Sequence, residues 1–173
     1  MQSKLYSIWI IPPLYLRENL AATIGSLGEK YSTPIFTPHI TIASEISVGI
    51  NKAKIETLNL SNNTEQFTVG LDFLGIGDDY FHCVFVNVKP NTFLASLVVK
   101  SYLLFDQTRQ PRFSPHLSIM YGNLNVETKR KAVLSAGSIQ EAFLVTHLYL
   151  YETPRDVGDW KYIEKFPLVE AGK

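Results

Sequence analysis

One short pattern occurs twice in the sequence: PHITI at residues 38–42 and PHLSI at residues 115–119. In both stretches a proline precedes a histidine, and the histidine and a hydroxyl residue alternate with apolar residues. Such alternation is typical of a half-buried β-strand. The two histidines are 77 positions apart in a chain of 173 residues, close to half its length. This spacing predicts two lobes related by approximate internal symmetry.

The residues around these stretches mix strand and helix patterns. They do not alternate strictly as β-α-β units do, which favours the α+β class with mostly antiparallel sheets flanked by helices. We expect residues 1–173 to form a single domain made of two interleaved lobes with a central cleft, and residues 67–88 to contain a hairpin. Strands are predicted at residues 5–11, 39–44, 67–74, 80–88, 115–122, 143–151 and 160–168, and helices at residues 14–31, 49–60, 91–105 and 126–134.

Composition narrows the class of protein. Hydrophobic residues make up 46% and charged residues 18% of the chain, which suits a packed core and argues against disorder. The 16 basic and 16 acidic residues cancel, so the basic face of a protein that binds long nucleic acids is not expected. The apolar residues 5–13 are too few to span a bilayer and lack a clear signal-peptide cleavage site. We therefore expect a cytoplasmic monomer with no membrane partner.

The two repeated stretches bring together groups that suit phosphoryl transfer. Residues two apart on a strand point to the same face, so His39 should project with Thr41, and His116 with Ser118. One neutral histidine can take a proton from water, and one protonated histidine can give a proton to the leaving oxygen on the opposite side of the phosphorus. The hydroxyls can donate hydrogen bonds to the non-bridging oxygens. This chemistry needs no metal and no cofactor.

Each motif alone is a weak signal, because a histidine two residues before a hydroxyl often arises by chance. His82 and His147 serve as internal controls, since Val84 and Tyr149 follow them at that spacing. The single cysteine, Cys83, lies in an apolar run typical of a buried small residue, and no cysteine pair has zinc-binding spacing. The paired motif therefore favours a functional interpretation.

The sequence resembles the two-histidine phosphoesterase superfamily, which is defined by two His-x-Thr/Ser motifs. Within it, the chain looks most like the cyclic phosphodiesterases of plants and yeasts. The resemblance implies a bilobal fold with a water-filled cleft between two antiparallel sheets. It also implies hydrolysis of ADP-ribose 1″,2″-cyclic phosphate to ADP-ribose 1″-phosphate, downstream of tRNA splicing, and opening of nucleoside 2′,3′-cyclic phosphates to 2′-phosphates. The segments that carry it are residues 6–9, 36–42, 80–85 and 114–121, with Trp160.

The resemblance also implies roles for individual residues. His39 and His116 correspond to the acid–base pair, with His116 as the base that activates water and His39 as the acid. Thr41 and Ser118 correspond to the residues that hold the phosphate.

Three aromatic residues are further candidates for substrate binding. Tyr121 and Trp9 either contact the nucleotide and wall the cleft or pack in the core with a polar tip, and both alternatives stay open. Phe81 belongs to the same group. His82 and His147 are expected to have no catalytic role.

Other functions remain possible at this point. The expected partner is a small nucleotide with a cyclic phosphate. The same chemistry would also suit an RNA-end 2′,3′-cyclic phosphodiesterase or an enzyme that cuts cyclic dinucleotides. A catalytically inactive nucleotide-binding module is the alternative from a different class, although intact histidines and hydroxyls in both motifs argue against it.

Overall fold

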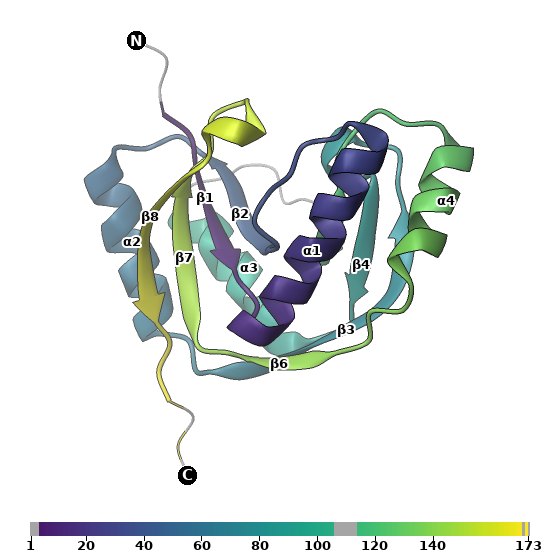
Figure 1. Ribbon diagram of the computed structural model, residues 1–173. Coiled ribbons are helices and arrows are strands. Elements are labelled where there is room, and N and C mark those ends of the chain that lie inside the picture. Colours follow the sequence, from purple (N-terminus) through teal and green to yellow (C-terminus); the bar gives the residue numbers. More distant parts are fainter. Residues whose placement is uncertain (1–3, 106–113, 171, 173) are drawn as a thin grey trace.

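The computed structural model describes residues 4–105, 114–170 and 172. Within these residues the chain forms eight strands, four α-helices and two 3-10 turns (Figure 1). The helices are α1 (Leu14–Tyr31), α2 (Ile50–Asn62), α3 (Thr92–Leu104) and α4 (Val126–Ala136), and the turns are η1 (Tyr80–His82) and η2 (Val157–Asp159). The strands are β1 (Tyr6–Ile10), β2 (Ile40–Ile46), β3 (Phe67–Ile76), β4 (Val84–Val88), β5 (His116–Met120), β6 (Ala142–Val145), β7 (His147–Glu152) and β8 (Lys161–Pro167).

The strands form one sheet in the order β6-β3-β4-β5-β2-β1-β7-β8, and all neighbours pair antiparallel. The predicted α+β architecture with antiparallel strands is therefore confirmed. Two halves of four strands meet where β5 lies beside β2. Helices α2 and α3 pack on the half that contains β2, β7 and β8, and α1 and α4 pack on the half that contains β3 and β5 (Figure 1).

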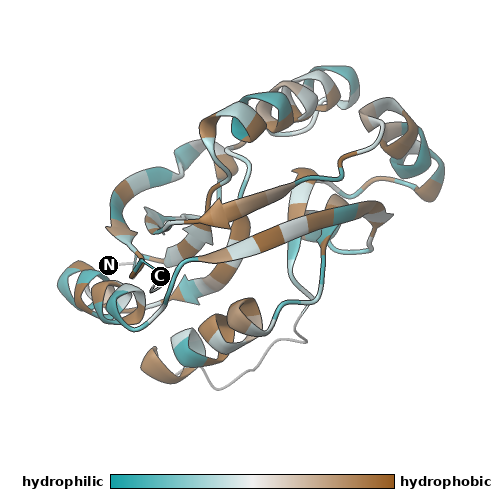
Figure 2. Cartoon of the chain, turned by 90° about the horizontal axis from the view of Figure 1, so that it is seen from below, coloured by the Kyte–Doolittle hydropathy of each residue, from teal (hydrophilic) through white to brown (hydrophobic). Residues whose placement is uncertain are grey.

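The core is built from the central strands and the apolar stripes of the helices. All five residues of β1 are buried, and Figure 2 shows brown, apolar residues concentrated along the central strands. Helix α1 follows Pro13 and buries Leu16, Leu20, Ile24 and Leu27, which recur at helical spacing. Burial of such a side chain stabilises the fold by roughly 1.5–3 kcal/mol. Among the described residues, no helix has the length and apolar character needed to cross a membrane.

The predicted strand over residues 80–88 is wrong in its first part. Tyr80–His82 form the 3-10 turn η1, and β4 begins only at Val84. The turn forms because the His82 N–H donates to the Asp79 carbonyl, and the Gly77 N–H donates to the Cys83 carbonyl. The predicted hairpin itself is correct, since β3 pairs antiparallel with β4.

The predicted strand over residues 143–151 is in fact two strands. Strand β6 pairs with β3, whereas β7 pairs with β1 and β8 in the other half of the sheet. The break falls at Thr146, whose carbonyl accepts from the Leu168 N–H. An unbroken apolar alternation concealed this change of pairing partner, because both segments keep a buried face.

Candidate active site

The two histidine motifs lie on adjacent antiparallel strands. Ile40 of β2 is paired with Leu117 of β5. Continued by one residue in each direction, this antiparallel register puts His39 opposite Ser118 and Thr41 opposite His116. Ile40 and Leu117 are fully buried, so the four polar side chains share the other face of the sheet. Each histidine therefore stands beside the hydroxyl residue of the other motif.

Both histidines are anchored in the same way. His39 Nδ1 lies 2.6 Å from the carbonyl oxygen of Thr37, and His116 Nδ1 lies 2.9 Å from that of Ser114. A carbonyl oxygen only accepts, so each Nδ1 carries the hydrogen. In the neutral ring, Nε2 then keeps its lone pair and can accept a proton. The structure thus prepares two imidazoles for proton transfer at Nε2.

His39 is the more deeply buried of the two. Its ring stacks on Trp9 with 3.7 Å between centroids and 16° between planes, and Trp9 stacks in turn on Tyr151 at 4.0 Å. Burial lowers the pKa of His39 to about 4, the Thr37 carbonyl acts in the opposite direction, and His116 lowers the pKa further. The ring is therefore neutral at pH 7.

His116 is partly exposed and has different neighbours. Its ring lies 4.2 Å from that of His82 and 5.4 Å from that of Phe85. Burial lowers the pKa of His116, the Ser114 carbonyl raises it, and His82 lowers it. Both imidazoles are thus biased towards the neutral form, and a bound phosphate anion would shift that balance towards protonation.

The two hydroxyl residues differ in their surroundings. Ser118 Oγ donates a hydrogen bond to the Phe81 carbonyl at 2.8 Å. It also hydrogen-bonds the hydroxyl of the buried Tyr121, whose pKa is raised by burial and lowered by this bond. Thr41 is exposed, and its hydroxyl has no hydrogen-bond partner among the described residues. Thr41 is therefore free to donate to a ligand, whereas the Ser118 proton is already bound.

The three aromatic candidates fall into two groups. Trp9 and Tyr121 are buried, with Trp9 under His39 and Tyr121 stacked on Phe36 at 3.8 Å. Phe81 is 49% exposed, and its ring lies 6.3 Å from that of Trp160 across the site. Packing accounts for Trp9 and Tyr121, whereas Phe81 presents a ring that a ligand can reach.

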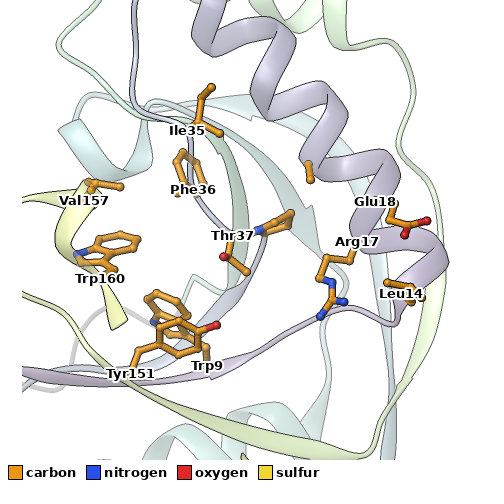
Figure 3. A pocket seen from close by; sticks show the side chains of 13 residues that line it. Trp9, Leu14, Arg17, Glu18, Ile35, Phe36, Thr37, Tyr151, Val157 and Trp160 are labelled. Atoms are coloured by element: carbon orange, nitrogen blue, oxygen red, sulfur yellow. The ribbon is translucent and has the colours of Figure 1, made fainter. Parts of the chain in front are cut away.

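A cavity of about 660 Å³, shown in Figure 3, is lined by residues that neighbour His39, although His39 itself is not part of the lining. Several residues of its lining contact His39: Trp9 stacks on the ring, Thr37 accepts the Nδ1 hydrogen bond, and Phe36 and Trp160 lie edge-on to the ring. Arg17 reaches into the same space from the first turn of α1, while the neighbouring Glu18 leaves the helix in a different direction. Among the described residues the Arg17 guanidinium has no ion-pair or hydrogen-bond partner. The cavity thus offers an unpaired cation beside the motif.

Some residues of the site were not expected. Tyr151 and Arg17 line the cavity, and His82 contacts His116. Tyr151 could have been found from strand alternation in β7, but Arg17 and His82 carry no such signal. The loop before His116 contains Arg109 and Arg112, which from sequence are either solvated loop charges or contacts for a diphosphate, and both lie outside the described residues. Within the part of the chain that the structure describes, no three His, Cys, Asp or Glu residues are grouped so that they could hold a metal ion.

Known proteins resemble this chain in sequence. The model of the family described as "Cyclic phosphodiesterase-like protein" matches residues 5–171. The cyclic phosphodiesterase of Arabidopsis thaliana is 25% identical over 134 residues, which cover 76% of this chain and 73% of that protein.

Solved structures with low sequence identity share the fold. E. coli LigT complexed with NADP+ has a TM-score of 0.66 and 17% identity, covering 98% of this chain and 99% of its own. The protein TT0787 of Thermus thermophilus has a TM-score of 0.65 and 13% identity, covering 98% and 100%. Since the family model covers nearly the whole chain, this protein belongs to the cyclic phosphodiesterase-like family of two-histidine phosphoesterases and is a cyclic phosphodiesterase.

Proposed function

We propose that the protein hydrolyses ADP-ribose 1″,2″-cyclic phosphate to ADP-ribose 1″-phosphate, and nucleoside 2′,3′-cyclic phosphates to nucleoside 2′-phosphates. One observation carries this proposal: the Ile40–Leu117 pair brings two imidazoles, each anchored through Nδ1, onto one face with two hydroxyl residues. The first substrate would put the enzyme downstream of tRNA splicing.

The proposed reaction adds one water across one P–O bond. One neutral imidazole takes a proton from the attacking water at Nε2, and the new P–O bond forms. The other imidazole, protonated at Nε2, gives its proton to the leaving oxygen as the ring P–O bond breaks. The two histidines exchange protonation states, and a proton returned through solvent restores the starting state.

We propose His116 as the base and His39 as the acid, as the family resemblance implies. The lowered pKa of both rings supports a neutral base. An acid at position 39 needs help, because burial lowers the pKa of His39 to about 4. The negative phosphate beside the ring would supply this help by favouring the imidazolium.

Thr41 is the main proposed donor to the phosphate. Its hydroxyl is exposed opposite His116 and has no partner among the described residues. Ser118 would join it by turning its proton from the Phe81 carbonyl to a phosphate oxygen, with the Tyr121 hydroxyl behind it. Such donors stabilise the charge that develops on the non-bridging oxygens.

The cavity beside His39 supports a nucleotide with more than one phosphate. Its volume of about 660 Å³ lies within the range of small-molecule sites, roughly 300–1,000 Å³. Arg17 offers a fork of donors suited to phosphate oxygens. We propose that Arg17 binds the diphosphate of ADP-ribose and that Phe81 and Trp160 contact the rest of the nucleotide. Solved complexes of E. coli LigT contain NADP+ and ATP, which carry several phosphates.

Hydrolysis assays on both cyclic substrates test the proposed function. The wild type should open both, and His39→Ala and His116→Ala should lose roughly 10²–10⁴ in rate, which is the usual contribution of one acid or base. His147→Ala is the matched control, because His147 lies on β7 and contacts neither motif ring. Full activity in either active-site variant would overturn the assignment. An RNA oligonucleotide with a 2′,3′-cyclic end and a cyclic dinucleotide complete the panel, and a marked preference for either would support that alternative.

A further inference from the structure

The two halves of the site have matching strand registers but stack different rings beside their histidines. Trp9 of β1 pairs with Thr41, and Phe85 of β4 pairs with Ser118. Trp9 and Phe85 therefore occupy matching positions on the two sides of the Ile40–Leu117 pair. On the first side, His39 stacks directly on Trp9. By symmetry, His116 should stack on Phe85.

His82 takes that place instead. Its ring stacks on Phe85 with 3.7 Å between centroids and 20° between planes, which closely matches His39 on Trp9. His116 meets Phe85 only edge-on, at 63°, and lies against His82 at 4.2 Å and 49°. His82 thus occupies the stacking position that symmetry would give to His116.

The backbone around His82 holds this ring in a fixed place. The Gly77 N–H donates to the Cys83 carbonyl at 3.1 Å, and the buried Lys129 donates from Nζ to the Gly77 carbonyl at 2.6 Å. A Cβ atom at Gly77 would clash first with the backbone carbonyl oxygen of His82, and it would also lie 2.8 Å from His82 Nδ1, closer than packing allows. Glycine at position 77 is therefore needed by both the backbone and the ring of His82. The turn before β4 packs His82 closely against Gly77.

The surroundings favour a neutral His82. Its buried Nε2 has no hydrogen-bond partner among the described residues, so a proton there would lack an acceptor. Burial lowers the pKa of His82, and Asp79 just before η1 raises it. The other titratable groups nearby are His116 on β5 and Lys129 on α4, which acts on Cys83 and the Gly77 carbonyl. The neutral ring can shield His116 without adding a charge next to it.

We propose that His82 is a positioning residue for His116. Its flat ring fixes the orientation of the His116 imidazole and keeps water from one side of it. His116 then stays unprotonated, with Nε2 available, until substrate arrives. This role rests on the proposed function of His116 as a proton-transfer residue.

Three substitutions test the role of the ring. His82→Ala and His82→Gln remove it, and His82→Gln keeps a polar side chain of similar reach should the alanine variant unfold. His82→Phe keeps a flat ring that cannot titrate. His147→Ala is the control for loss of a histidine elsewhere. The pKa of His116 is measured by NMR titration without substrate, and kcat/KM is measured against pH.

In the two variants without a ring, water should reach His116, and its pKa should rise towards the ordinary value of about 6.5. The acidic limb of kcat/KM should move to higher pH, and kcat should fall roughly tenfold, a fraction of the usual 10²–10⁴ contribution of a base. His82→Phe and His147→Ala should match the wild type.

An unchanged His116 pKa in both ringless variants would overturn the proposal. A phenylalanine variant as impaired as the glutamine variant would also overturn it, because the imidazole nitrogens would then be what matters. The NMR titration needs no turnover, so a wild type that hydrolyses neither substrate would refute the proposed function separately.

Discussion

The hydroxyl of Ser118 is bound to the Phe81 carbonyl, 2.8 Å away, while Thr41 in the matching position of the other motif is exposed and unbound within the described residues. The same pair of motifs therefore contains one hydroxyl with a structural contact and one without.

The two hydroxyl variants should consequently behave differently. Thr41→Ala should lower kcat by roughly 10²–10³, as removal of one oxyanion donor does, and leave stability unchanged. Ser118→Ala should lower activity less and also destabilise the fold by roughly 0.5–1.5 kcal/mol, because the bond to Phe81 is lost. Steady-state kinetics and urea unfolding separate the two. Equal stability of both variants would show that the Phe81 contact contributes nothing to the fold.

The pH optimum should depend on which kinetic constant is measured. Burial lowers the pKa of both motif histidines, that of His39 to about 4. Since kcat/KM reports the free enzyme, its maximum should lie on the acidic side of about pH 6.5, the ordinary pKa of histidine. The phosphate anion raises both pKa values in the complex, so the kcat maximum should lie at higher pH. Profiles of kcat and kcat/KM from acidic to mildly alkaline pH test whether the kcat maximum lies at the higher pH. Coincident maxima would contradict this prediction.

Folding stability should fall in mildly acidic solution because of His39. Its pKa is about 4 in the folded protein and about 6.5 in an unfolded chain, so the unfolded state binds the proton first as the pH drops. The free energy of unfolding should therefore decrease between about pH 6.5 and about pH 4 by about 3 kcal/mol from this residue alone. Urea unfolding of the wild type and His39→Gln should show a smaller decrease in the variant. If the free energy of unfolding decreases equally with falling pH in both proteins, His39 is not buried in solution.

Arg17 should matter only for the substrate with a diphosphate. Arg17→Met should reduce kcat/KM on ADP-ribose 1″,2″-cyclic phosphate roughly tenfold to a hundredfold, the range for loss of a charged hydrogen bond, and should not affect 2′,3′-cyclic AMP. Arg155→Met is the matched control, because Arg155 is exposed in the loop between β7 and β8. An equal loss on both substrates would remove Arg17 from the proposed diphosphate site.

A sulfur leaving group can identify the acid. A thiolate leaves without a proton far more readily than an alkoxide, since thiols have pKa values near about 8.5. On a 2′,3′-cyclic substrate with sulfur at the 3′ position, His39→Ala should regain much of its lost activity and His116→Ala should not. Rescue of His116→Ala instead would reverse the proposed roles.

The central part of the site could be predicted from sequence because it depends on local alternation. Same-face spacing within each motif needs only a strand, and both motifs lie where β2 and β5 form. The buried face of α1 is equally predictable from sequence, because Leu16, Leu20 and Ile24 recur at helical spacing.

His82 could not be placed in this way. Had the strand of β4 begun at Tyr80 as predicted, His82 would share a face with Val84 and Val86, which are fully buried on the side away from the motifs. The 3-10 turn breaks that alternation and directs the imidazole onto Phe85. The turn is closed by the bond from the His82 N–H to the Asp79 carbonyl and is supported by hydrogen bonds of Gly77 and Lys129. A supporting side chain on α4 produces no periodic pattern in residues 80–88.

The pairing of Ile40 with Leu117 means that neither motif is a complete unit. Each histidine lies beside a hydroxyl residue from the other half of the chain. Under the proposed mechanism, two separate fragments of the chain would each carry half of the catalytic groups, and neither would be active. Activity would return only when the fragments reassociate. The hydrolysis rate would therefore measure how much of the protein has β2 and β5 paired in the native register. A slip of one residue between these two strands would disable both motifs together.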